Sequence, residues 1–164
     1  MVISSVPQNS CSARAERDGA VVDDAFDVVL HYPKLRVLLR SNLLTCAAGP
    51  RFRLNGTKGS FVKCGSDPQE EALKRGETPQ QPNWGQEPAE NWGTLSLAEG
   101  DTVAQTRVPT ATGDYRRYYE NVRDAIVSGT PLEVSPQHAL SIMHALELGM
   151  ESSRRGCKLP FGEV

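Results

Sequence analysis

The sequence predicts an α+β fold, a mainly antiparallel open sheet with helices packed on one of its faces. Polar and apolar residues alternate through the first two-thirds of the chain, which is the period of half-buried strands. In the last third, apolar residues recur at helical spacing instead. The length of 164 residues suits one domain with a core of its own. We therefore expect residues 1–164 to form a single domain.

The first strands are expected between residues 4 and 40. The polar stretch 4–15 is typical of an edge strand or a weakly buried strand. Residues 24–32 alternate clearly, with Phe26, Val28 and Leu30 on one face. A tight connection at 32–35 leads into a second alternating run. The two runs are predicted to pair as an antiparallel hairpin with one dry face and one charged face.

The glycine-rich stretch RFRLNGTKGSFVKCGSDPQ, residues 51–69, could form either a phosphate-binding loop or a turn between strands. A phosphate loop needs G-x-x-x-x-G-K-[ST], whereas here Lys58 precedes Gly59 and the glycines lie too close together. Polar and apolar residues alternate on both sides of Asn55 and Gly56, a pair that tolerates positive φ. The pattern therefore favours a β-hairpin over residues 51–63.

A short helix, a long loop and another hairpin are expected next. Asp67 or Ser66 can cap the helix with Pro68 at its first position, and Gly76 can end it. The loop 76–93 is rich in proline and holds both tryptophans of the chain, Trp84 and Trp92. Linkers seldom carry two tryptophans, so these side chains are expected to pin the loop to a surface or to line a pocket. The second hairpin is predicted to pair residues 93–97 with residues 102–108.

Two helices complete the chain, and each has one apolar face that is expected to be buried. Asp114 and Gly129 suit the ends of the first helix, and Ser135 with Pro136 suits the start of the second. The apolar positions of the first helix are Tyr115, Tyr118, Tyr119, Val122 and Ile126. Those of the second helix are Ala139, Ile142, Met143, Leu146 and Met150.

With helices on one face of the sheet, the opposite face is expected to carry Arg36, Leu38 and Arg40. A large mixed sheet face is rarely left bare. We therefore expect this face to meet another domain or subunit, and to make the protein a homo-oligomer.

Composition excludes several classes of function. The formal net charge of -2 and the lack of a basic stripe argue against binding to nucleic acid. No apolar run is long enough to cross a membrane, and the first residues lack the layout of a signal peptide, so a cytoplasmic protein is expected. The four cysteines and three histidines show no metal-ligand spacing, so reduced thiols and no metal site are expected.

In this order, the segments resemble the C-terminal α/β part of the glucose-fructose oxidoreductase / inositol 2-dehydrogenase / MocA family. The resemblance rests on DDAFDVVLHYPKLRVLLRSNLL, RFRLNGTKGSFVKCGSDPQEEALKRG, NWG and GDYRRYYENVRDAI, and it spans about residues 4 to 160. The N-G-T-K-G-S-F and D-P-Q-E-x-x-L runs are similar to those of one bacterial branch of oxidoreductases.

The resemblance implies a parent enzyme of about twice this length, whose N-terminal Rossmann domain binds NAD or NADP. Neither G-x-G-x-x-G nor the family's E-K-P motif occurs here, so this chain is expected to lack that domain, to bind no cofactor alone and to be inactive alone. Asp27 and His31 spell the family's D-x-x-x-H, but without its glycine-rich surroundings, so we treat the match as coincidental and assign no catalytic residue.

Two functions remain open. In the first, the chain is the substrate and assembly domain of an NAD(P)-dependent oxidoreductase that acts on a sugar-like or polyol substrate. Asp67, Gln69 and Trp84 would then lie near the substrate, because an indole face packs on a sugar ring while carboxylate and amide bind its hydroxyls. Asp67 could instead only cap a helix and Trp84 only anchor the loop. In the second function, the chain is a stand-alone, non-catalytic module that dimerises through its sheet.

Overall fold

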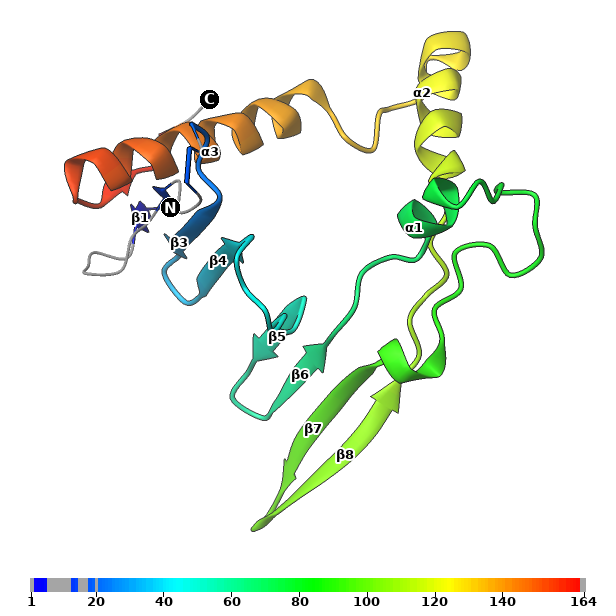
Figure 1. The fold of residues 1–164 in the computed structure, drawn as a ribbon, viewed down its shortest axis with the longest axis horizontal. Helices are drawn as coiled ribbons and strands as arrows, with labels where there is room; N and C mark the ends of the chain where they lie inside the picture. Colours follow the sequence, from blue (N-terminus) through cyan, green and yellow to red (C-terminus); the bar gives the residue numbers. More distant parts are fainter. Residues whose placement is uncertain (1, 6–12, 15–17, 20, 163–164) are drawn as a thin grey trace. The chain divides into compact units, whose positions relative to one another are not determined.

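The computed structural model describes residues 2–5, 13–14, 18–19 and 21–162. Within these residues, antiparallel strands and three α-helices confirm the predicted α+β class (Figure 1). The chain divides into two compact units, Met1–Cys46 with Glu133–Val164, and Ala47–Leu132. In chain order the elements are β1 (Val2–Ser5), β2 (Ala13–Arg14), β3 (Ala25–His31), β4 (Arg36–Asn42), β5 (Phe52–Asn55), β6 (Gly59–Lys63), α1 (Gln69–Lys74), the 3-10 helix η1 (Ala89–Asn91), β7 (Gly93–Glu99), β8 (Thr102–Val108), α2 (Arg116–Ser128), α3 (Pro136–Arg155) and β9 (Leu159–Pro160).

The first unit holds a five-stranded antiparallel sheet with β3 at its centre. On one side β3 pairs with β4 along its whole length, and on the other it pairs with β1 and β2. The predicted hairpin is confirmed, since Tyr32 N–H donates to Leu35 O at 2.8 Å and closes the connection. Within the predicted stretch 4–15, residues 6–12 and 15 lie outside the described residues.

Helix α3 covers one face of this sheet and lies against β1 (Figure 1). Its N-terminus is as predicted, because Ser135 Oγ accepts from His138 N–H at 3.2 Å and Pro136 is the first helical residue. Gly149 is buried, and a Cβ placed there would lie 3.6 Å from Val28 on β3. Val28 pairs with Leu39 of β4, so both residues lie on the face that the helix covers.

The prediction of the buried face of α3 is wrong. Ile142 and Leu146 are exposed at 60% and 56%, and the other members of the predicted stripe, Ala139, Met143 and Met150, are exposed as well. Gly149 and Ser152 are buried instead. Short side chains let the helix backbone approach the sheet, which leaves the large apolar residues on the outer side.

The second unit contains a four-stranded antiparallel meander in the order β5-β6-β7-β8. The hairpin expected over residues 51–63 is confirmed, and its turn is closed by Gly56 N–H donating to Gly59 O at 2.8 Å. The second predicted hairpin is also confirmed, with Gly93 to Glu99 paired to Thr102 to Val108. A Cβ at position 93 would lie 2.1 Å from the Phe61 ring, so any other residue there would displace that ring.

Helices α1 and α2 occur as predicted, with two corrections. Pro68 is the N-cap of α1, and α2 begins after an N-cap at Tyr115, so each starts about one residue later than expected. The face of α2 that was expected to be buried is largely exposed: Tyr119 is exposed at 71% and Ile126 at 80%. Val122 is half-buried.

Candidate functional site

Asp67, Gln69 and Trp84, which the sequence placed near a substrate, form one hydrogen-bonded cluster. Gln69 is 1% exposed and lies at its centre. Its amide oxygen accepts from Trp84 Nε1–H at 2.8 Å and from the backbone N–H of Tyr115 at 2.9 Å. Its amide nitrogen donates to Asp67 Oδ1 at 3.1 Å and to Oδ2 at 3.0 Å. The amide therefore joins α1, the loop 76–93 and the start of α2.

The local sequence explains why these residues meet. Asp67 Oδ1 also accepts from Gln69 N–H at 2.9 Å, which turns the chain into α1 and places the Gln69 side chain under the loop. Gly85 follows Trp84 with φ +71, and a Cβ there would lie 2.0 Å from Gly113 O. Glycine at this position allows the loop and the segment before α2 to cross in contact.

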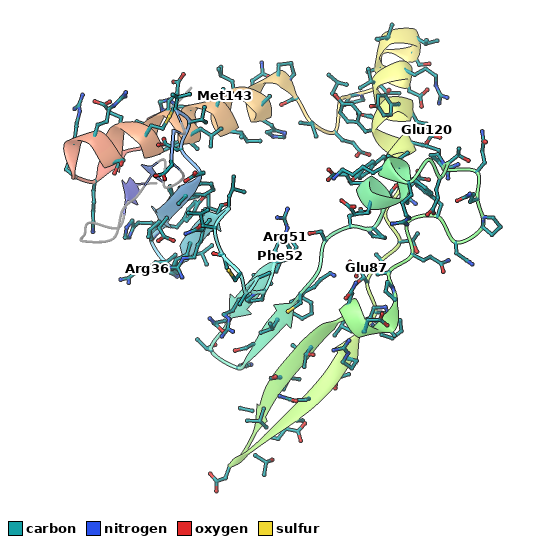
Figure 2. The ribbon with its side chains drawn as sticks, in the orientation of Figure 1. Arg36, Arg51, Phe52, Glu87, Glu120 and Met143 are labelled. Carbon is teal, nitrogen blue, oxygen red and sulfur yellow. The ribbon has the colours of Figure 1, made fainter. Side chains whose placement is uncertain are left out.

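A second anchor holds the other end of the loop. Lys63 Nζ donates to both carboxylate oxygens of Glu87, at 2.8 and 2.7 Å, and to the carbonyl oxygen of Asn91 at 3.2 Å. The side chains of Lys63 and Glu87 are 13% and 3% exposed. Glu87 lies close to η1 (Figure 2). Burial opposes ionisation of Glu87, but the hydrogen bonds and charge of Lys63 outweigh it and hold the pKa of the carboxyl below its ordinary value.

The loop and α1 line a partly open hollow of about 150 Å³ beside Trp84. Its apolar lining comes from Pro68, Ala72 and Pro82 together with the indole. Arg75 and Glu77 line it too, and Arg75 Nε donates to Glu77 Oε1 at 2.7 Å. An apolar wall with charged and amide groups beside it can bind a small polyhydroxylated molecule by one face.

The predicted oligomer face is turned away from α3. Arg36, Leu38 and Arg40 alternate with Val37 and Leu39 along β4, so they lie on the face opposite Val28. Leu38 is 63% exposed. Arg40 forms an ion pair with Asp27, directly across from it on β3. Asp27, the first residue of the D-x-x-x-H match, is thus engaged with a cross-strand arginine.

Sequence reasoning missed the Lys63–Glu87 pair and the role of Gly113. Lys63 ends a strand and Glu87 lies in a loop, 24 residues apart, so no spacing rule joins them. Within the described residues, no group of three His, Cys, Asp or Glu side chains is placed to hold a metal ion. None of the helices described is long and apolar enough to cross a membrane.

Comparison with known proteins shows what the chain is similar to. Residues 3–161 match the family described as "Oxidoreductase family, C-terminal alpha/beta domain". The oxidoreductase YdgJ of Escherichia coli is 37% identical over 143 residues, which cover 87% of this chain and 41% of YdgJ. The scyllo-inositol 2-dehydrogenase (NADP(+)) IolW of Bacillus subtilis is 32% identical over 145 residues, 88% of this chain and 40% of IolW.

Solved structures agree with these relatives. The oxidoreductase yvaA from Bacillus subtilis superposes with a TM-score of 0.88 at 29% identity, over 96% of this chain and 44% of yvaA. YPO2259 from Yersinia pestis gives a TM-score of 0.86 at 33% identity, over 97% of this chain and 43% of that protein. The chain thus spans about two-fifths of the length of the curated relatives that it matches.

Proposed function

The chain belongs to the C-terminal α/β domain of this oxidoreductase family, and from that membership we propose that it is the substrate-side domain of an NAD(P)-dependent oxidoreductase. The substrate we propose is a polyol or a sugar-like molecule. IolW, whose name states an NADP(+)-dependent reaction of scyllo-inositol, supports both the cofactor class and the substrate class. The cofactor would be bound by an N-terminal domain of the longer parent, so this chain alone is expected to be inactive.

The observation that carries the proposal is the hollow beside Trp84. Its lining combines Trp84 with Arg75 and Glu77, and Gln69 accepts the 2.8 Å hydrogen bond from the indole of Trp84. A fixed aromatic wall can pack on the carbon face of a polyol ring while charged groups take its hydroxyls. In this arrangement Trp84 contacts the substrate, and Asp67 and Gln69 hold Trp84 in place.

We further propose that the face of Arg36, Leu38 and Arg40 is the homo-oligomer interface. Its exposed leucine, with arginines on both sides, supports this role. The exposed free thiols of Cys46 and Cys64 suit a reducing compartment, so we place the protein in the cytoplasm. A stand-alone module that dimerises through this face is the competing function, and it requires no cofactor-binding parent.

The test joins the N-terminal part of Bacillus subtilis IolW, whose name states the NADP(+)-dependent reaction of scyllo-inositol, to the whole of this chain and follows NADPH formation from scyllo-inositol. Trp84→Ala removes the indole wall, whereas Trp84→Phe keeps an aromatic face and loses only the hydrogen bond to Gln69. We expect Trp84→Ala to raise KM about tenfold or more, the effect of losing about 1.4 kcal/mol of binding, and Trp84→Phe to raise it less. Trp92→Ala is the matched control, with a wild-type KM. Equal KM values for all four proteins would show that the hollow does not bind substrate.

A further inference from the structure

The turn between β5 and β6 carries the pair Asn55-Gly56, which has no part in the proposed function. Asn55 ends β5 and Gly56 begins the connection, and both residues are exposed. An Asn-Gly pair is chemically labile, because glycine has no Cβ to hinder the approach of its backbone nitrogen to the asparagine side chain. Each of the other asparagines precedes a larger residue: Asn9 before Ser10, Asn42 before Leu43, Asn83 before Trp84, Asn91 before Trp92 and Asn121 before Val122.

We propose that Asn55 is a site of spontaneous deamidation, and that opening of the β5–β6 turn sets its rate. The reaction consumes only water. The Gly56 backbone nitrogen loses its proton to a solvent base and forms a bond to Asn55 Cγ, while the Cγ–Nδ2 bond breaks and the amide nitrogen takes up a proton and leaves as ammonia. Water then opens the resulting succinimide ring at either carbonyl, which leaves aspartate or isoaspartate at position 55. No electron is transferred.

The folded turn opposes this reaction in two ways. Gly56 N–H donates to Gly59 O at 2.8 Å, so the attacking nitrogen is engaged in a hydrogen bond. Asn55 is a strand residue paired with Ser60, and the extended backbone of a strand holds the next nitrogen away from the Asn55 side chain. Ring closure therefore requires that the bond from Gly56 to Gly59 breaks and that the end of β5 leaves its extended conformation.

Strand β5 is suited to such local opening. It lies at one end of the order β5-β6-β7-β8, and among the described residues β6 is the strand with which it pairs (Figure 1). All four residues of β5 are exposed. Short segments with few buried contacts open at a lower cost than the unit as a whole. The far side of the turn is held by β7, because Ala98 N–H donates to Lys58 O at 3.3 Å, so opening releases β5 and leaves β6 paired.

Deamidation makes the opening permanent. Isoaspartate routes the main chain through the former side-chain methylene, which lengthens the backbone by one carbon atom and leaves a charged carboxylate as the branch. The lengthened chain cannot keep the register in which Asn55 pairs with Ser60 and Leu54 pairs with Phe61. Formation of isoaspartate is therefore expected to detach β5 from the sheet.

Incubation of the whole chain in heavy-oxygen water at mildly alkaline pH measures the reaction, because each opened succinimide takes one oxygen from the solvent and mass spectrometry locates it. The same chain unfolded in urea gives the intrinsic rate. We expect folded Asn55 to react about tenfold more slowly than unfolded Asn55, the factor for about 1.4 kcal/mol of turn stability, and still faster than Asn121 in the same sample. Equal rates at Asn55 and Asn121 in the folded chain would refute the site. Equal rates at Asn55 in the folded and unfolded chains would refute control by the turn.

Two substitutions separate opening of the turn from unfolding of the whole unit. Leu54→Gly weakens β5 and is expected to raise the folded-state rate about fivefold relative to the unfolded rate of the same variant, the factor for about 1 kcal/mol. Val103→Gly is the matched control, because Val103 lies on β8 at the other end of the strand order and is 64% exposed, close to the 62% of Leu54. It is expected to leave the rate at Asn55 unchanged. Equal acceleration by the two substitutions would overturn control by the turn.

Gly56→Ala tests the chemistry. Gly56 does not have a positive φ, and a Cβ there would lie in ordinary contact, 3.5 Å from Gly59 O, so the turn accepts alanine. The added methyl group hinders the attacking nitrogen. We therefore expect deamidation of Asn55 in the unfolded variant to slow by about tenfold, the factor for about 1.4 kcal/mol on the barrier. Reaction at the wild-type rate would show that the backbone nitrogen of residue 56 is not the nucleophile.

Discussion

The buried amide of Gln69 offers the sharpest test of the structure, through Gln69→Met. Methionine has nearly the same length and shape as glutamine and can fill the same space. It cannot accept the hydrogen bonds from Trp84 Nε1–H and Tyr115 N–H, which are 2.8 and 2.9 Å long in the wild-type protein. Both donors would stay in the part-buried cluster without a partner. The substitution therefore isolates hydrogen bonding from packing.

The magnitude follows from those two donors. A buried donor that loses its acceptor costs about 1–3 kcal/mol, and two of them cost about 2–5 kcal/mol when some water enters the site. The bonds from Gln69 to Asp67 add little, because Asp67 is exposed and can bind water instead. We expect Gln69→Met to lower the free energy of unfolding by about 3 kcal/mol.

Urea unfolding monitored by tryptophan fluorescence measures this change, since Trp84 is one of the two tryptophans. Gln80→Met is the matched control, because Gln80 is exposed, and we expect an effect within about 0.5 kcal/mol. Emission of Trp84 should also shift to longer wavelength in Gln69→Met as the indole becomes hydrated. If Gln69→Met and Gln80→Met are equally stable, the cluster does not join α1, the loop and α2.

Three other substitutions test separate features. Leu146→Ala should change the unfolding free energy of this chain by about 0.5 kcal/mol or less, because Leu146 is 56% exposed; a loss of about 2 kcal/mol or more in chemical denaturation would show that the residue is buried. Glu87→Gln should flatten the dependence of stability on pH. The folded-state pKa of Glu87 is lowered from 4.5, so its stabilising pair with Lys63 is present above pH 4.5 and lost as the pH falls below it. An unchanged acid-unfolding curve for this variant would contradict that pairing. Gly149→Ala should stabilise α3 by up to about 1 kcal/mol, measured by thermal unfolding, because the new Cβ would lie in ordinary contact, 3.6 Å from Val28; a lower melting temperature would mean that the helix lies closer to the sheet.

Local rules predicted most of the elements correctly. Alternation identified β3 and β4, and glycine positions identified the turns between β5 and β6 and between β7 and β8. Capping by Ser135 located the start of α3. These features depend on residues close in the sequence, so the sequence alone determines them. The distribution of strands over two sheets depends on long-range pairing, which no local pattern specifies.

The sequence predicted which residues lie in the candidate site, but it did not predict the contacts between them. Trp84 was identified because a linker seldom carries two tryptophans, and the loop 76–93 holds both Trp84 and Trp92. The sequence offered no sign that Gln69 would be fully buried and hydrogen-bonded at both ends of its amide. Tyr115 enters the cluster through its backbone N–H, so its side chain carries no signal of that contact. Bonds between side chains and distant backbone atoms are invisible to motif analysis for this reason.

The error on α3 has a physical cause that extends to other helices. Periodicity locates the large apolar residues of a helix, but it does not identify the surface that covers them. Close approach of a helix to a sheet requires short side chains, and Gly149 and Ser152 supply them on α3. Neither residue is strongly hydrophobic, so a search for apolar residues does not identify this face as the buried one. The large apolar residues of α3, Ile142, Met143, Leu146 and Met150, then remain exposed on the other side of the helix and available for a second layer. An apolar stripe in a sequence therefore indicates that a partner surface exists, and the partner need not be the nearest sheet of the same chain.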